Sequence, residues 1–161
     1  GPFAKFNEFR KQCMAYIAQT GGQIKYGHSE VGNFTQDGKV YEQNEIEFLP
    51  NPVETAADQL VLAKWVIRNL AQMNGLDVTF APKITVGKAG SGLHIHMRMM
   101  KDGKNCMIKD HKLSEEARRA IAGMMILAPS CFCPPATPAS WKLWALPACG
   151  SIHFVPGWIC V

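Results

Sequence analysis

A predicted β-hairpin with its turn at Asp37–Gly38 constrains this chain more than any other feature. The two central residues of the tightest hairpin loops need a positive φ angle, and Asp-Gly is one of the sequences that favour it. If Gln36 pairs with Lys39, the register of the whole hairpin is fixed. Phe34 then lies opposite Tyr41, and such an aromatic cross-strand pair stabilises the ribbon.

The same register predicts a pair of acidic side chains farther from the turn. Glu30 falls directly opposite Glu45, and His28 falls opposite Glu47 on the same face. Two carboxylates in direct opposition weaken a ribbon unless a cation lies between them or one of them is protonated. The ordinary alternative is a solvated hairpin end, where glutamates are common. We interpret the pair as a candidate site for a divalent metal.

Two histidines and a glycine-rich loop are the other candidate site residues. His94-Ile95-His96 is expected on a strand, where residues two apart share a face, so both imidazoles point the same way. Carboxylates favour magnesium or manganese, whereas imidazole also suits zinc. The preceding loop, Gly90-Ser91-Gly92, lets the backbone approach a ligand closely, and consecutive amides can hold an anion. The ordinary alternatives are a polar sheet face and a plain connection.

The composition is that of a globular protein with a mild charge. Of 161 residues, 47% are hydrophobic and 19% are charged, with a formal net charge of +4; this length suffices for one domain with a core. The positive charge is not gathered into a run, which disfavours nucleic acid as a partner. No apolar stretch is long enough to span a membrane, and the start lacks the plan of a signal peptide. Because Cys13 and Cys106 stand alone, we expect a cytoplasmic protein with reduced thiols.

The composition changes abruptly after Pro129. We therefore expect one domain over residues 1–129 and an atypical tail, rich in cysteine, proline and tryptophan, over residues 130–161. Three interpretations of the tail stay open: a proline-rich wrap on the body, half of a metal site at Cys131-Phe132-Cys133, or a non-native segment such as the product of a shifted reading frame. The tail's cysteines are Cys131, Cys133, Cys149 and Cys160.

Hydrophobic spacing and capping residues predict the helices and strands. Asn51 is the expected N-cap of the second helix, with Pro52 as its first residue and Glu54 as its capping-box partner. Ser114 is expected to cap the last helix. The expected elements are a helix over Phe6–Gln19 ended by Gly21–Gly22, the hairpin over Gln23–Leu49, a helix from Pro52 ended by Gly75, strands over Val78–Ala81 and Leu93–Met99, a turn at Lys101–Lys104, and a helix after Ser114 closed by Pro129.

Several short motifs stand in a specific order along the chain. They are Ser29-Glu30-Val31-Gly32, Gln43-Asn44-Glu45-Ile46, Ala57-Asp58-Gln59, Thr79-Phe80-Ala81-Pro82-Lys83, Gly90-Ser91-Gly92-Leu93-His94-Ile95-His96 and Asp102-Gly103-Lys104-Asn105. In this order they resemble glutamine synthetases. The resemblance runs from about Phe3 to Pro129 and is to the central part of a catalytic domain of the bacterial type.

The resemblance implies an α+β fold, part of a half-barrel with a largely antiparallel sheet and packed helices. It implies two divalent metals, Mg²⁺ or Mn²⁺, between ATP and glutamate. ATP would phosphorylate the γ-carboxylate of glutamate, and ammonia would then displace phosphate. Cations suit this reaction because they neutralise developing charge and align the reacting groups.

The resemblance also assigns roles to the candidate residues. Glu30 and Glu45 would bind the metal on the glutamate side. His94 would bind the metal on the nucleotide phosphates, and His96 would lie near the nucleotide. The loop Gly90, Ser91 and Gly92 would lie against the bound glutamate. No single residue is assigned as catalytic.

The chain departs from the family pattern in several places. Ala89 stands where the family commonly has an asparagine, the hairpin between Glu30 and Glu45 is longer than in the commonest form, and the tail contains no arginine. The family's strand with two further metal-binding glutamates would precede Gly1, so we expect this chain alone to be inactive. Two alternatives stay open: a related ligase that joins glutamate to another amine, and a non-catalytic fragment that only keeps the fold. The parent is expected to form a homo-oligomeric ring, without nucleic acid or membrane as a partner.

Overall fold

The computed structural model describes residues 4–132 and 159–160. The chain divides into two compact units, one formed by residues 1–97 and 153–161 and the other by residues 98–152. The mixture of helices and small antiparallel sheets in the described residues confirms the predicted α+β fold class. The elements are α1 (Asn7–Gln19), β1 (Ile24–Gln36), β2 (Lys39–Phe48), α2 (Val53–Met73), β3 (Met100–Lys101), β4 (Lys104–Asn105), β5 (Ile108–Lys109), β6 (Lys112–Leu113), α3 (Glu115–Phe132) and β7 (Ile159–Cys160).

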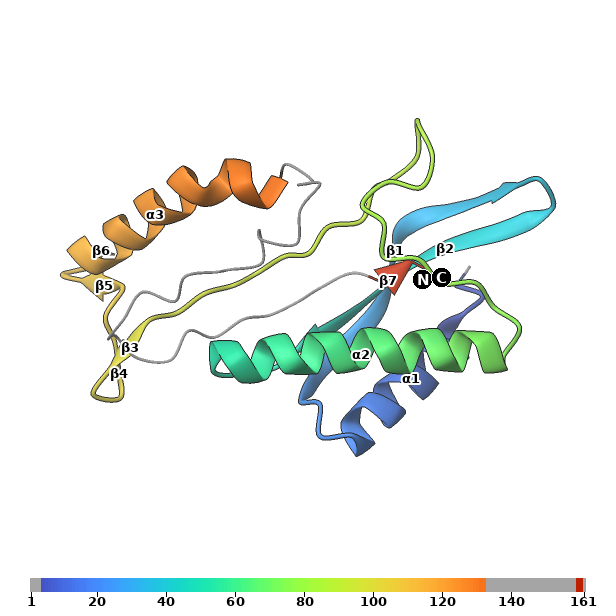
Figure 1. The fold of residues 1–161 in the computed structure, drawn as a ribbon, viewed down its shortest axis with the longest axis horizontal. Helices are drawn as coiled ribbons and strands as arrows, with labels where there is room; N and C mark the ends of the chain where they lie inside the picture. Colours follow the sequence, from blue (N-terminus) through green and yellow to red (C-terminus); the bar gives the residue numbers. More distant parts are fainter. Residues whose placement is uncertain (1–3, 133–158, 161) are drawn as a thin grey trace. The chain divides into compact units, whose positions relative to one another are not determined.

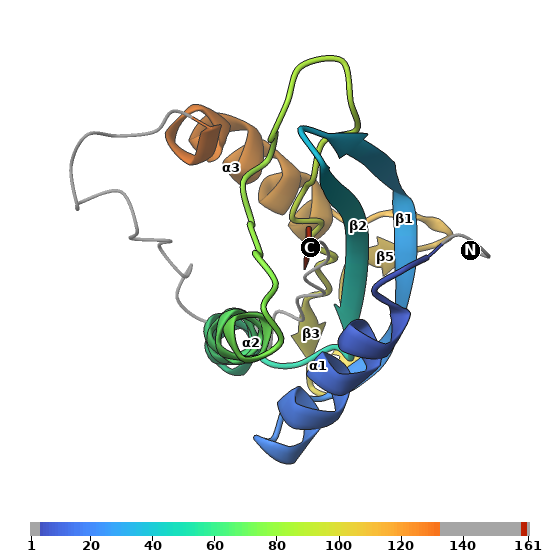
Figure 2. The ribbon, with the colours of Figure 1, turned by 90° about the vertical axis from the view of Figure 1, so that its right-hand side faces the viewer.

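The core of the first unit lies between α1, α2 and one face of β2. On β2, Ile46 and Phe48 are buried and point toward the helices. Glu45 and Glu47 alternate with them along the strand and therefore point to the other face. Both views place α1 and α2 next to each other at the base of the β1–β2 hairpin, away from its tip (Figures 1 and 2). The helical side chains of this core are Phe9, Cys13, Ile17, Ala63, Val66, Ile67, Leu70 and Ala71.

The hairpin turn has the predicted geometry. Asp37 and Gly38 have φ angles of 52° and 74°, and Gln36 pairs with Lys39. Phe34 lies opposite Tyr41, and the two rings stack with centroids 4.7 Å apart and planes 8° apart. The register predicted from the turn is therefore confirmed near the tip.

Nearer the base of the hairpin, the predicted register is wrong. Between the pairs Asn33↔Glu42 and Ser29↔Asn44, β1 advances four residues (33 − 29) while β2 advances two (44 − 42). The two extra residues of β1 form a bulge that shifts every later pair. His28 consequently lies opposite Glu45, not Glu47, and Glu30 lies inside the bulge rather than directly opposite Glu45.

The helix ends follow the glycines, but one cap was predicted wrongly. Gly21 and Gly75, with φ angles of 93° and 66°, follow α1 and α2 as expected. The cap residue of α2 is Pro52, and no side chain caps this end, so neither Asn51 nor Glu54 does so. Asn51 instead donates a hydrogen bond from its side-chain amide to the carbonyl of Leu49, at 3.0 Å.

Two of the predicted strands do not form. Residues 93–98 carry no strand pairing, and Thr79 is a single bridge residue within the predicted strand over Val78–Ala81. An isolated extended segment needs a neighbouring strand for its backbone hydrogen bonds, and among the described residues none pairs with 93–98. The apolar and polar alternation of this segment therefore did not predict a strand correctly.

The second unit contains two short hairpins and a helix. Asp102 and Gly103, with φ angles of 50° and 74°, form the turn between β3 and β4, which confirms the predicted turn. The hairpin of β5 and β6 was not predicted. Ser114 caps α3, because its Oγ accepts a hydrogen bond from the Ala117 amide at 3.1 Å. The helix continues beyond Pro129 to Phe132, so its predicted end is wrong; a helical proline removes one backbone hydrogen bond without always ending the helix.

Most of the tail from residue 130 lies outside the described residues, and so do the side chains of its cysteines. The boundary at residues 129 and 130 and the three interpretations of the tail therefore stay predictions. Its described strand, β7, pairs with β2 through Gln43↔Cys160 and Asn44↔Ile159. Among the described residues, no helix combines the length and the apolar character that crossing a membrane requires.

Candidate metal centre

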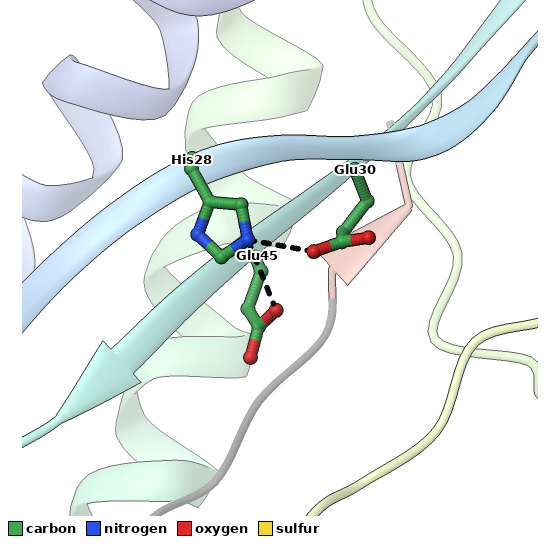
Figure 3. A group of neighbouring side chains, drawn as sticks. All are labelled: His28, Glu30 and Glu45. Carbon is green, nitrogen blue, oxygen red and sulfur yellow. Dashed lines mark hydrogen bonds and ion pairs between the residues drawn. The ribbon is translucent and has the colours of Figure 1, made fainter.

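Two side chains of β1 and one of β2 meet on the face of the hairpin opposite the core. His28 and Glu30 are two residues apart, and Glu45 lies across from His28. His28 Nε2 lies 2.6 Å from Glu30 Oε1 and 3.5 Å from Glu45 Oε2. Figure 3 shows both carboxyl groups turned toward the imidazole. The bulge thus brings Glu30 and Glu45 together around His28 even though they are not direct cross-strand partners.

These three residues fit a divalent cation. Each offers one ligand atom, and the three atoms lie within 4.8 Å of one another. Two carboxylates with one imidazole are donors that Mn²⁺ accepts readily, and Mg²⁺ favours the carboxylates. The side chains of Glu30 and Glu45 are 19% and 14% exposed, so both charges are held with limited access to water. Among the described residues, this is the group of three His, Cys, Asp or Glu side chains close enough together to hold a metal ion.

The pKa of Glu45 reflects its burial and its acidic neighbours. Burial raises the pKa of Glu45, the nearby His28 lowers it, and the charges of Glu30 and Glu47 raise it again, so that the pKa is raised overall. Nδ1 of His28 is buried and has no hydrogen-bond partner. A bound cation would favour the ionised carboxylates, because an opposite charge at this range stabilises them.

A second set of contacts extends this face toward the base of the hairpin. Tyr26 stacks on His28 with ring centroids 5.5 Å apart. Lys25 Nζ lies 2.8 Å from Glu47 Oε1. Burial raises the pKa of Glu47, but hydrogen bonds from Lys25 and Tyr26 and the charges of Lys25 and His96 lower it overall. His96 therefore lies within electrostatic range of this carboxylate.

His94 is exposed and is not a member of the group formed by His28, Glu30 and Glu45. The resemblance assigned it to a different metal, on the nucleotide phosphates, so this placement does not test the assignment. His94 and His96 stay predictions as metal and nucleotide residues. His28 was placed near the carboxylates but was not among the predicted ligands, although the His-x-Glu spacing on a strand was a usable signal.

The glycine loop contacts the hairpin through Gln43, a residue that sequence reasoning did not select. Gln43 is 3% exposed, and its Nε2 donates to the Gly90 carbonyl at 2.8 Å and to Ser91 Oγ at 3.2 Å. Its Oε1 accepts from the Gly32 amide at 3.1 Å. The signal available in the sequence was its position two residues before Glu45, which puts it on the same face of β2.

A buried polar network on the opposite face of β2 was also missed. The Glu42 carboxylate accepts hydrogen bonds from the Lys5 amide at 2.6 Å and from Asn44 Nδ2 at 3.1 Å. Arg10 donates to Asn44 Oδ1 at 2.5 Å and also to Asn7. Glu42, Asn44 and Arg10 are at most 8% exposed. This network attaches the start of α1 to the strand that carries Glu45.

Comparison with known proteins identifies the family. A family model described as the catalytic domain of glutamine synthetase matches residues 1–142. The chain is 35% identical over 132 residues to a glutamine synthetase of Mycobacterium tuberculosis, covering 80% of this chain and 26% of that protein. It is 33% identical over 127 residues to one of Thermus thermophilus (77% and 27%) and 31% identical over 121 residues to one of Pyrococcus horikoshii (75% and 26%).

The chain spans about a quarter of the length of these curated relatives. The family match, in contrast, covers most of the chain, from residue 1 to residue 142. It includes the hairpin with His28, Glu30 and Glu45 as well as the loop that Gln43 contacts. The chain therefore belongs to the glutamine synthetase family and matches its catalytic domain.

Proposed function

We propose that this chain is part of the catalytic domain of an ATP-dependent ligase that forms glutamine from glutamate and ammonia through a γ-glutamyl phosphate. The group formed by His28, Glu30 and Glu45 carries this proposal, because a phosphoryl transfer needs a divalent cation held by fixed ligands. Family membership supports the reaction class. The cation, Mg²⁺ or Mn²⁺, would supply charge neutralisation and alignment of the reacting groups when bound.

In this proposal Glu30 and Glu45 hold the cation on the glutamate side, and His28, whose Nε2 lies near both carboxylates, supplies a third ligand. The loop Gly90, Ser91 and Gly92 lies against bound glutamate. His94 belongs to the cation on the ATP phosphates, and His96 lies near the nucleotide. The proposal also includes a cytoplasmic location and a homo-oligomeric ring for the parent protein.

The test compares carboxylate variants in a full-length synthetase that carries this segment. Phosphate release is measured with glutamate, ammonia, ATP and Mg²⁺. Glu30→Gln and Glu45→Gln each lower the rate by more than about a hundredfold. This is a larger loss than is usual for a residue that only hydrogen-bonds to a metal ligand. Glu54→Gln, an exposed glutamate at the start of α2, is the matched control and leaves the rate unchanged. Full activity in Glu45→Gln would remove the basis of the proposal.

Two further measurements concern the nitrogen donor of the proposed ligase and the activity of the present chain by itself. A panel of amines on the same full-length protein separates ammonia from other nitrogen donors, since the metal and phosphate groups would be shared by both kinds of ligase. The present chain, which spans about a quarter of its relatives, is expected to release no phosphate on its own.

A further inference from the structure

The side chain of Gln43 connects two segments that are far apart in the sequence. Its amide nitrogen donates to the Gly90 carbonyl at 2.8 Å and to Ser91 Oγ at 3.2 Å, across 47 and 48 residues of chain. Its amide oxygen accepts from the Gly32 amide inside the bulge of β1, at 3.1 Å. Gln43 is 3% exposed, so losing these partners would leave a buried amide group without hydrogen bonds, which is costly.

The loop that Gln43 contacts has little else to hold it by burial. Residues 86–90 are all exposed. The Ser91 amide donates to the Pro82 carbonyl at 2.8 Å, the Lys83 ammonium donates to the Lys88 carbonyl, and the Lys88 ammonium lies 5.7 Å from the centre of the Phe34 ring. A segment with few buried apolar contacts opens easily. The Gln43 amide is therefore a large part of what fixes Gly90 and Ser91 against the hairpin.

Steric fit at both ends makes the arrangement specific. A Cβ atom on Gly32 would lie 2.8 Å from Gln43 Oε1, and a Cβ atom on Gly90 would lie 2.9 Å from the Pro82 carbonyl oxygen. Gly32 therefore lets the bulge approach the glutamine closely, and Gly90 lets the loop fold tightly onto Pro82. Only a side chain with both a donor and an acceptor at this length satisfies the two contacts.

We propose that Gln43 is a positioning residue that fixes the loop Gly90–Gly92 relative to the carboxylates of the metal centre. Gln43 precedes Glu45 by two residues on the same face of β2, so the loop and Glu45 share one rigid support. The claim that the loop contacts glutamate rests on the proposed function. The claim that Gln43 holds the loop in place depends only on the hydrogen bonds above.

The test is limited trypsin digestion of the metal-free chain, with cleavage after Lys83 and Lys88 followed by mass spectrometry. Gln43→Met, which removes the donor and the acceptor, accelerates these cleavages at least about fivefold, because proteolysis follows the population of the opened loop. Ser91→Ala removes one of two acceptors and accelerates them about twofold. Gln36→Met, at the exposed hairpin tip, is the matched control and changes nothing.

Cleavage after Lys11 in α1 and Lys64 in α2 reports on the stability of the first unit as a whole and stays constant in all variants. Unchanged cleavage after Lys88 in Gln43→Met would overturn the inference, and so would an equal acceleration at every site. If Gln43→Met fails to fold, Gln43→Glu serves instead, since it keeps the size and the acceptor for Gly32 but sets an oxygen against the Gly90 carbonyl. It is expected to accelerate cleavage after Lys88, and an unchanged rate overturns the inference equally.

Adding Mn²⁺ and L-glutamate separates this inference from the proposed function. In the unmodified chain these ligands slow cleavage after Lys88, and in Gln43→Met they no longer do so. If they give no protection to the unmodified chain, the glutamate role of the loop is wrong. The metal-free comparison then still decides whether Gln43 holds the loop.

Discussion

His28 lies opposite Glu45 across the β1–β2 hairpin, with its Nε2 3.5 Å from the carboxylate oxygen Oε2 of Glu45. The turn alone would have paired His28 with Glu47. The bulge between Ser29 and Asn33 moves the imidazole to the carboxylate that the metal centre needs and turns Glu30 toward it at 2.6 Å. The bulge therefore reshapes the site, because it changes which side chains lie opposite one another.

His28 is expected to contribute a nitrogen ligand to Mn²⁺. Pulsed electron paramagnetic resonance of the Mn²⁺-loaded chain detects a nitrogen coupling that disappears in His28→Ala, and the affinity for Mn²⁺ falls at least about tenfold. His111→Ala, an exposed histidine in the turn between β5 and β6, is the control and keeps the coupling. A coupling that survives in His28→Ala would show that the imidazole only neighbours the cation.

Replacing Glu42 is expected to destabilise the first unit strongly. Its carboxylate is 1% exposed and accepts hydrogen bonds from the Lys5 amide and Asn44, with Arg10 bonded to the same Asn44. Removing it leaves buried donors without a partner, so Glu42→Ala lowers the free energy of unfolding by about 3 kcal/mol. Urea denaturation measures the change. The exposed Glu54→Ala should cost less than about 0.5 kcal/mol, and equal values for the two variants would contradict the role of this network.

Cys13 is expected to make the stability depend on alkaline pH. Burial raises the pKa of its thiol to about 12, above the value of about 8.5 in the unfolded chain. Between these values the folded state keeps a proton that the unfolded state loses. The contribution of the Cys13 thiol to the free energy of unfolding is therefore full below about pH 8.5 and is lost as pH rises toward about 12. In urea titrations, the free energy of unfolding therefore falls more steeply over this range in the unmodified chain than in Cys13→Ala. Parallel slopes would contradict the assignment.

Much of the local structure could be predicted because local chemistry determines it. The Asp37–Gly38 turn, the Phe34–Tyr41 pair and the cap at Ser114 each depend on residues close in sequence, and all three are confirmed. The register beyond the tip depends on extra residues in one strand only. Nothing in an alternating pattern shows where such a bulge lies, although Gly32 beside Gln43 marks the place in the structure.

Long-range polar contacts were the least predictable part of the site. Gln43 bonds to Gly90, 47 residues away, and Glu42 bonds to the Lys5 amide, 37 residues away. A sequence read alone shows that these residues alternate along a strand but not what lies against either face. The failed strand over Leu93–Met99 has the same origin, because a strand is defined by a partner and not by its own alternation.

The central claim is that the side chains of the hairpin hold a divalent cation, and calorimetric titration with Mn²⁺ tests it most directly. The unmodified chain and the control Glu54→Gln are predicted to bind one Mn²⁺ ion per chain. The heat of this binding is predicted to be absent in both Glu30→Gln and Glu45→Gln. Unchanged binding in these two variants, or no binding by the unmodified chain, would contradict it.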